Sequence, residues 1–438
     1  MALVAVVVYS PFWPLSFVSD SYLQVVLART YGHPADWATL AEDPLYRCRS
    51  TSLVFTWLLD AWAGPVPQVH RLANFALHLV NAVLLFSLIR RLALGPMVAS
   101  IAGAVFAVHE VHQEAVIWVA ALPELLVFFF VLAALRLWAE VLTKPSWTRL
   151  AGTAALFALA LGSKESGVVF LPLAAALWWW RRRQPEWSGA GTDRRVWWWL
   201  CAGAALAGIY AVAILTTGDS HLHLTDGTFS LGAPFVRTEF ASIFRILMPF
   251  GWLAVALLLA GCEFGLVGAS FLWMSVTLLP YSFLTYQTRV PSRHTYLASA
   301  GAALLIAAAV RLLWRSQRRW LAPALLGLGL AYPLWSWRRL DAINRFLRAE
   351  LLGLSTEPGL VIPPLPTSRL GDSIGRQTME LHAVIGALRA AMHEQERTLQ
   401  FLSHDMRAPQ AAILTLLDSN VAGSLDGGLA ERLRRHAR

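Results

Sequence analysis

The chain has 438 residues, of which 57% are hydrophobic and only 14% carry a charge. This balance excludes an ordinary soluble domain and indicates a membrane protein. The net charge of +9 therefore predicts basic loops on the cytoplasmic side rather than nucleic-acid binding. The three cysteines, Cys48, Cys201 and Cys262, are scattered and predict neither a disulfide framework nor a metal site.

Apolar runs predict an all-α, polytopic membrane body over residues 1–337, with about 11 transmembrane helices (roughly 10–12). Arginine-rich loops between alternate runs predict the cytoplasmic side, and tryptophan clusters at the ends of runs predict the membrane interfaces. The long segment 18–68 would then be a periplasmic loop. The expected spans lie near residues 1–17, 69–89, 97–116, 121–142, 149–163, 165–180, 196–215, 239–260, 265–284, 297–314 and 320–337.

Polar residues interrupt this apolar body in a few short stretches, of which the first two are Asp20, after the first run, and residues 109–114, which read HEVHQE. His109, His112 and Glu114 are spaced to share one side of a helix. Because burying such groups is costly, they predict contacts to a substrate or a metal ion. The alternative is a hydrogen-bonded polar cluster that shapes a cavity.

Two further charged pairs follow. Lys164 and Glu165 stand in the sequence SKES between two apolar runs, where they either contact a lipid-linked phosphate or end the helices at the interface. Arg293 and His294 open the sequence RHTYLASAG before a late run. A guanidinium group binds phosphoryl oxygens bidentately, so Arg293 suits a phosphate-bearing substrate, the alternative being an interface anchor.

Taken in order, these stretches resemble the GT-C class of membrane glycosyltransferases, especially bacterial relatives of protein O-mannosyltransferases, over about residues 10–350. The resemblance implies a multi-pass protein of the bacterial inner membrane that transfers a sugar from a polyprenyl-phosphate donor. It implies Asp20 as the catalytic base and allows a divalent metal as the one cofactor. Family members often carry two adjacent acids, whereas here the neighbour is Ser19, and Asp20 could instead cap a helix.

The character of the chain changes at residue 338. Residues 338–371 combine an amphipathic piece with a proline-rich linker that cannot be helical. Beyond it, apolar residues in steps of three and four predict a long coiled-coil or helical-hairpin segment, and a homodimer through residues 372–420. These residues are Ile374, Leu381, Ile385, Leu388, Met392, Leu399, Leu402 and Met406.

Residues 401–409 of this segment read FLSHDMRAP and resemble the H-box of sensor histidine kinases. The resemblance implies that residues 372–438 are a dimerisation and phosphoacceptor module, with His404 as the phosphoacceptor and Asp405 holding its ring or taking its proton. Ala408 stands where many relatives have Thr or Asn, so phosphatase activity is not expected. The sequence contains no ATP-binding lobe, and the module is expected to be truncated, relying on a complete kinase in trans or on a response regulator.

Two interpretations follow. In the first, the chain joins a glycosyltransferase body to a truncated phosphoacceptor module. In the second, it is a component of a two-component sensor whose membrane body only senses or anchors. An odd number of spans with a cytoplasmic start places the C-terminus in the periplasm, whereas phosphorelay needs His404 in the cytoplasm, so topology separates the two.

Overall fold

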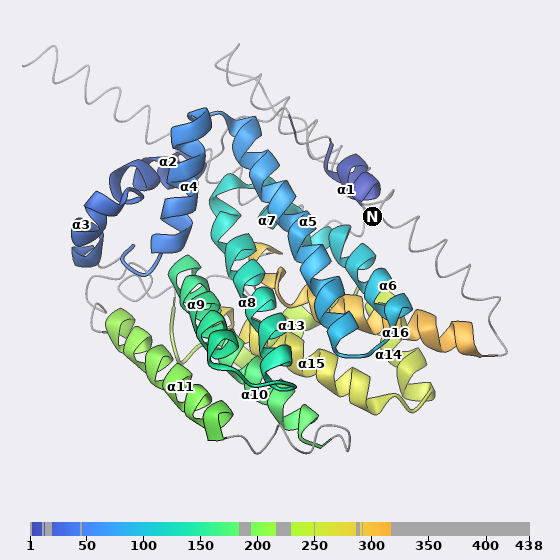
Figure 1. The fold of residues 1–438 in the computed structure, drawn as a ribbon. Helices are drawn as coiled ribbons and strands as arrows, with labels where there is room; N and C mark the ends of the chain where they lie inside the picture. The colour runs from blue at the N-terminus through green and yellow to red at the C-terminus, as the bar shows by residue number, and fades with distance from the viewer. Residues whose placement is uncertain are drawn as a thin grey trace, which may run out of the picture. The chain divides into compact units, whose positions relative to one another are not determined.

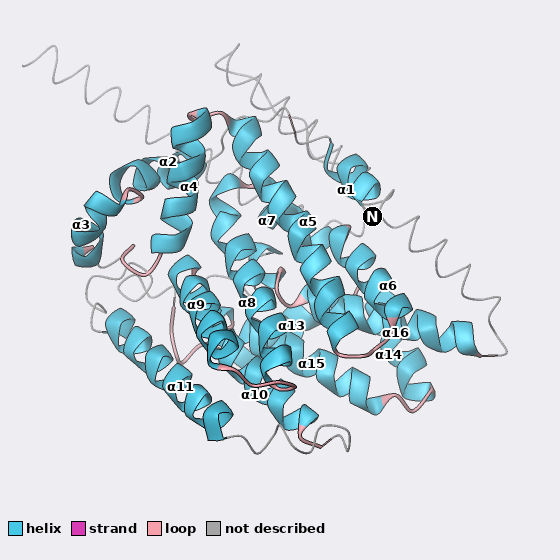
Figure 2. Ribbon diagram, in the orientation of Figure 1, coloured by secondary structure: helices cyan, strands magenta, loops and turns pink. Residues whose placement is uncertain are grey.

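The computed structural model describes residues 2–10, 13, 20–43, 46–183, 194–215, 229–248, 250–285, 290 and 292–316. These residues are almost entirely helical, and their one element of β structure is an isolated bridge between Phe229 and Leu284 (Figure 2). The all-α fold class is therefore confirmed for the described part. The chain divides into two compact units, residues 1–352 and 353–438. The predicted span 320–337 and the predicted coiled coil lie outside the described residues.

The predicted periplasmic loop 18–68 is itself largely helical. Two of its helices are tied together, because Arg29 donates to both carboxylate oxygens of Asp60 at 2.7 and 2.9 Å and Gln24 donates to Thr56 at 3.0 Å. These helices form one group in Figure 1. The elements of this N-terminal part are α1 (Ala2–Tyr9), α2 (Asp20–Tyr31), η2 (Pro34–Asp36), α3 (Trp37–Glu42) and α4 (Ser50–Ala63).

The main core is built around α8, which packs against both α5 and α9 (Figure 1). Trp138 of α8 is fully buried, and its indole N–H donates to the carbonyl of Ala174 at 2.9 Å, which joins α8 to α10. The elements of this part are α5 (Pro67–Arg91), α6 (Pro96–Ala107), η3 (Glu110–His112), α7 (Gln113–Ile117), η4 (Val119–Ala121), α8 (Leu122–Val141), α9 (Trp147–Ser163), η5 (Glu165–Val169), α10 (Phe170–Arg181) and α11 (Arg194–Leu215).

A second apolar cluster joins the remaining helices, and α16 connects it to the main core by packing on α6, α14 and α15. The α15–α16 contact is close: a Cβ atom on Gly301 would lie 2.7 Å from the carbonyl oxygen of Ser270, so this position needs glycine. The elements are α13 (Phe235–Leu247), α14 (Phe250–Ala260), α15 (Phe264–Leu278), η8 (Leu279–Tyr281), η9 (Ser292–Thr295) and α16 (Ser299–Arg315).

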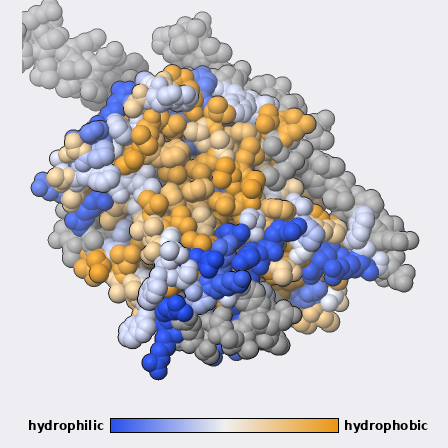
Figure 3. Space-filling model, in the orientation of Figure 1, coloured by the Kyte–Doolittle hydropathy of each residue, from blue (hydrophilic) through white to orange (hydrophobic). Residues whose placement is uncertain are grey.

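Several described helices can cross a membrane. Four are long and apolar enough, and a bent pair, α13 with α14, raises the number to five. The four are Pro67–Arg91, Val119–Val141, Arg194–Val212 and Phe264–Tyr281, which match the runs predicted near 69–89, 121–142, 196–215 and 265–284. Figure 3 shows a broad apolar face bordered by hydrophilic residues, as a bilayer requires. The chain is therefore a membrane protein, and the remaining expected spans that the structure describes form shorter helices.

Two predicted spans are not single continuous helices, although the second can still form one bent span. In the run 97–116, α6 ends at Ala107, and two short elements, η3 and α7, follow. In the run 239–260, α13 and α14 meet at 91°. Pro249 stands between them, and proline has no N–H and clashes with the carbonyl four residues back, so one straight helix cannot pass through it.

Candidate functional site

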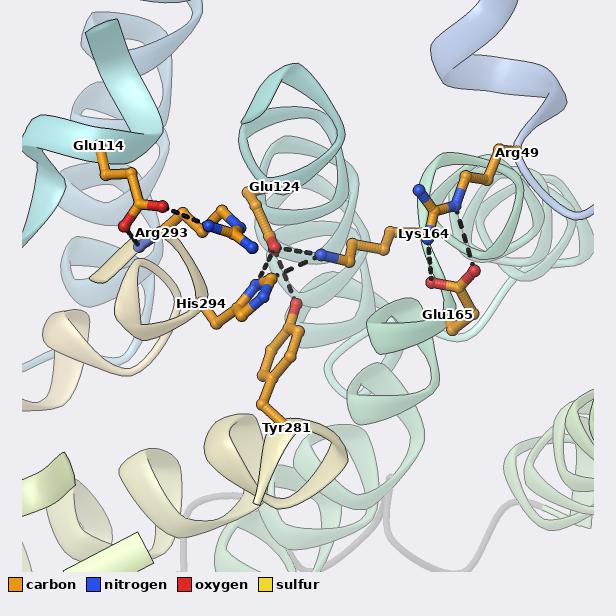
Figure 4. A network of polar contacts seen from close by, with 8 residues as sticks. All are labelled: Arg49, Glu114, Glu124, Lys164, Glu165, Tyr281, Arg293 and His294. Atoms are coloured by element: carbon orange, nitrogen blue, oxygen red, sulfur yellow. Dashed lines mark hydrogen bonds and ion pairs between the residues drawn. The ribbon is translucent and has the colours of Figure 1, made fainter. Parts of the chain in front are cut away.

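The centre of the candidate site is Glu124, in the first turn of α8. Its side chain is 1% exposed and accepts hydrogen bonds from three groups that come from distant parts of the chain (Figure 4). Lys164 Nζ and His294 Nδ1 both contact Oε1, and the hydroxyl of Tyr281 donates to Oε2 at 2.7 Å. The rings of Tyr281 and His294 also stack, with centroids 4.4 Å apart. One carboxylate thus holds together α8, the junction of α9 with η5, η8 and η9.

The local sequence explains why these groups point inward. Pro123 lies at the start of α8, where its missing N–H costs nothing, and a carboxylate in the first turn is stabilised by the positive end of the helix. Lys164 is the residue that ends α9 and has an extended backbone, with φ −165° and ψ 154°. Its backbone N–H closes the helix on Ala160 at 3.2 Å, and its side chain reaches Glu124.

A second carboxylate, Glu114 of α7, binds the other half of the η9 segment. It accepts from the hydroxyl of Ser292 at 2.6 Å, from the backbone N–H of Arg293 at 3.1 Å, and from the Arg293 guanidinium. The guanidinium carbon lies 4.8 Å from the ring centroid of Trp118, a cation–π contact. Both charged side chains are 25% exposed, so this end of the cluster is open to a ligand or to water.

A third ion pair completes the row in Figure 4. Arg49, just before α4, donates to Glu165 through Nε at 3.2 Å and Nη2 at 3.4 Å. Neighbouring residues thus take different partners: Lys164 binds Glu124 while Glu165 binds Arg49. When His294 is neutral, the charges of the cluster balance in three pairs: Arg49 with Glu165, Lys164 with Glu124, and Arg293 with Glu114. An anionic ligand must therefore displace one of the carboxylates before it can bind a cation.

Three charged residues of the cluster that lie outside the spanning helices have altered pKa values. Burial opposes ionisation of Glu165, but the charges of Arg49 and Lys164 outweigh it and lower its pKa to about 2. Burial likewise opposes ionisation of Glu114, and the Arg293 charge with the hydrogen bonds around it brings the pKa below the usual value. Burial lowers the pKa of Lys164, against the raising effect of Glu124. The two glutamates therefore remain ionised at neutral pH.

A polar stripe on α5 supports this cluster, and the sequence interpretation did not include it. Asn74 donates to the carbonyl of Trp118 at 3.2 Å, and Nε2 of His78 lies 3.0 Å from the carbonyl of Ala107. Both carbonyls stand where a helix has just ended; that of Ala107 closes α6, and that of Trp118 also accepts from the backbone N–H of Ala121 at 2.9 Å as η4 begins. Side chains from α5 thus satisfy the backbone at the breaks, as a protein in hydrocarbon requires.

The same stripe anchors the start of α16. The hydroxyl of Tyr296 lies 2.8 Å from Nδ1 of His78 and accepts from Asn81 at 3.2 Å. Asn81 also donates to the carbonyl of Leu125 in the first turn of α8. Polar residues three or four apart within one apolar run were the sequence feature that could have revealed this stripe.

His109 and His112 lie beside the cluster rather than in it. Nε2 of His112 lies 2.6 Å from the hydroxyl of Ser299. The centroids of the His112 and Phe106 rings lie 4.4 Å apart. His109 is buried, and its ring centroid lies 5.6 Å from that of His112. Within the described part of the chain, no group of three or more His, Cys, Asp or Glu residues is arranged to hold a metal ion.

Asp20 is the first residue of α2, a helix that packs on η4 through the buried pair Val25 and Val119. Glu124 follows η4 by three residues, so α2 lies near the charged cluster. The side chain of Asp20 lies outside the described part of the chain. The phosphoacceptor candidates His404 and Asp405 lie outside the described residues.

The structure therefore brings together five of the predicted site residues and adds three that sequence reasoning had not assigned. The five are Glu114, Lys164, Glu165, Arg293 and His294, and the additions are Arg49, Glu124 and Tyr281. An acid directly after a proline at the start of an apolar run was the feature that could have pointed to Glu124. Arg49 carries no such feature, because its partner is 116 positions away.

The chain was compared with protein-family models, with curated proteins and with solved structures. None of the three comparisons yields a match.

Proposed function

We propose that the membrane body is a glycosyltransferase that moves a sugar from a polyprenyl-phosphate donor to an acceptor at the bacterial inner membrane. The observation that carries the proposal is the convergence of separate sequence stretches on one charged cluster, next to helices that can span a bilayer. Charged groups inside a membrane protein are costly to bury and mark functional sites. The motif resemblance supplies the reaction class.

The chemistry follows from the partners in the cluster. A departing lipid phosphate is an anion, and Arg293 can offer it a planar pair of donors once Glu114 gives way. Lys164 provides a second cation from a site shielded from water, where charge interactions are strong. In this proposal Asp20 takes the proton of the acceptor hydroxyl as the oxygen attacks the anomeric carbon and the bond to the lipid phosphate breaks.

Replacing Asp20 with asparagine is expected to lower sugar transfer by about 10²–10⁴-fold, the usual contribution of a general base. Asp36→Asn, in the same N-terminal segment, is the matched control and is expected to leave transfer unchanged. The measurement is release of polyprenyl phosphate from a radiolabelled lipid-linked sugar by the purified full chain in detergent. Equal rates for Asp20→Asn and the wild type would remove Asp20 from the proposed mechanism.

A second proposal concerns residues 372–438, and the sequence FLSHDMRAP carries it. We propose that this segment dimerises through residues 372–420 and that His404 accepts a phosphoryl group from a kinase in trans. The neutral imidazole of His404 attacks the terminal phosphorus of ATP held by that kinase as the bond to ADP breaks, while Asp405 holds the other ring nitrogen or takes its proton. An aspartate of a response regulator then receives the phosphoryl group. In the alternative function, the membrane body only senses or anchors this module.

The phosphorelay proposal requires a cytoplasmic C-terminus, so a reporter fused after Arg438 tests it. We expect fluorescence from a fused fluorescent protein and no activity from a fused alkaline phosphatase. The same reporters placed after Arg91, in a predicted cytoplasmic loop, serve as the control. Alkaline-phosphatase activity at Arg438 would place His404 outside and exclude phosphorelay, while the glycosyltransferase proposal would be unaffected.

A further inference from the structure

A second group of charged residues lies at the far end of α8 from Glu124. Glu140 stands in the last turn of this helix, and a rise of ~1.5 Å per residue places it about 24 Å along the axis from Glu124. The hydrocarbon core of a bilayer is about 30 Å thick, so the two carboxylates lie near opposite surfaces of the membrane. The group around Glu140 is therefore separate from the candidate site.

Two arginines share the carboxylate of Glu140. Arg136 pairs with it from one turn back on α8, and Nε of Arg149, in the first turn of α9, lies 3.8 Å from its Oε2. Arg136 also donates from Nε to the hydroxyl of Ser87 at 3.0 Å, which ties the end of α8 to the end of α5. Because residues four apart share one face of a helix, Arg91 extends from the same side of α5 as Ser87.

Basic residues of the neighbouring elements join this group. Arg149 donates to the carbonyl of Lys144 at 2.7 Å, in the turn between α8 and α9. Arg181, in the last turn of α10, donates to the carbonyl of Arg91 at 2.9 Å, which brings the end of α10 to the end of α5. We call the following four residues the basic rim: Arg91, Arg136, Lys144 and Arg149. Among the described residues, the one carboxylate paired with the basic rim is that of Glu140, so the rim has a net positive charge and attracts anions.

The basic rim is accessible at the depth of the lipid head groups. Arg91 and Lys144 are exposed, and the side chain of Arg149 is 37% exposed. Trp147, two residues before Arg149, is 70% exposed, and exposed indoles are typical of the boundary between acyl chains and head groups. Figure 3 shows hydrophilic residues along an edge of the broad apolar face. A phosphate in the head-group layer can therefore reach the basic rim without leaving the membrane.

We propose that the basic rim binds the phosphate of an anionic phospholipid, with Arg91 and Arg149 as its main contacts and the acyl chains beside Trp147. A guanidinium group binds phosphoryl oxygens bidentately, and basic side chains at a membrane surface attract anionic lipids. Glu140 competes with the lipid for Arg149, because both are anions. A lipid held in this way ties α5 to α9. The site does not depend on the proposed sugar transfer.

The test uses the full chain in nanodiscs that contain equal amounts of phosphatidylglycerol and phosphatidylcholine. After extraction and extensive washing with detergent, native mass spectrometry identifies the lipid that stays bound. We expect phosphatidylglycerol to be retained in preference. Arg91→Gln and Arg149→Gln are each expected to lower this preference about fivefold, the factor that corresponds to ~1 kcal/mol for one basic side chain. Arg237→Gln, at an exposed position near the start of α13, removes the same charge outside the basic rim and should leave the preference unchanged.

Glu140→Gln tests the proposal in the opposite direction. This change removes the anion that competes for Arg149, so the preference for phosphatidylglycerol should rise, by about fivefold, although the protein loses an ion pair. A distorted protein would lose the preference rather than gain it, so the rise separates an effect of charge from an effect of folding. Equal retention of the two phospholipids would point to a soluble anion as the occupant and overturn the proposal. A wild-type preference in Arg91→Gln and Arg149→Gln, an equal fall in Arg237→Gln, or a fall in Glu140→Gln would overturn it as well.

Discussion

Glutamine in place of Glu124 is expected to destabilise the folded protein by about 3–5 kcal/mol, the cost of removing one partner from a buried ion pair. Lys164, 13% exposed, would lose its counter-charge, and His294 would lose an acceptor. Tyr281 would lose a charged acceptor and keep only a neutral one. Because four elements meet at this carboxylate, the loss should also loosen η9. The measurement is the free energy of unfolding in mixed detergent micelles.

Glu140→Gln is the matched control for this prediction. Glu140 stands on the same helix and pairs with Arg136 one turn away, but both side chains are more than a quarter exposed. Its loss should cost less than ~1 kcal/mol, as for other exposed pairs. Replacing Lys164 with methionine in the Glu124→Gln background should recover part of the stability, because no unpaired charge then remains. Similar losses for Glu124→Gln and Glu140→Gln would show that Glu124 does not hold the cluster.

Hydrophobic runs predicted the helical class and the positions of most helices, because a segment in hydrocarbon must satisfy its own backbone. The run 69–89 corresponds to α5 and the run 121–142 to α8. The same reasoning did not predict the breaks within 97–116 and 239–260, because hydropathy measures how apolar a run is and not whether its helix continues. At 239–260 the break was predictable from Pro249. At 97–116 the helix ends at Ala107, whose carbonyl lies 3.0 Å from Nε2 of His78 on α5, a partner 29 positions away that no local pattern of the run contains.

The candidate site was predicted as a set of residues but not as a set of pairs. Charged residues in apolar surroundings marked Glu114, Lys164 and Arg293 in the sequence. Their partners lie on other elements, 179 positions apart for Glu114 and Arg293, and 40 for Lys164 and Glu124. Pairing therefore depends on how α8 packs between its neighbours, which is a property of the whole core.

Alanine in place of Gly167 is expected to displace the backbone of η5 and thereby to disturb the charged cluster around Glu124. A Cβ atom at this position would lie 2.6 to 2.8 Å from backbone atoms of Ala160 and Leu161 in the last turns of α9. A backbone cannot rotate away as a side chain can, so η5 must shift, at a cost of about 1–3 kcal/mol for overpacking. Lys164 and Glu165 would move with it.

The functional loss from Gly167→Ala should exceed the loss of stability, since a displacement of about 1 Å at a site can cost ~10²-fold in rate. Gly208→Ala is the control: a Cβ atom there meets nothing within 4 Å, and alanine is the better helix former. Sugar transfer and unfolding are measured on both variants. If Gly167→Ala lost stability but kept the wild-type transfer rate, the position of η5 would matter to the fold alone, and Lys164 would leave the proposed site.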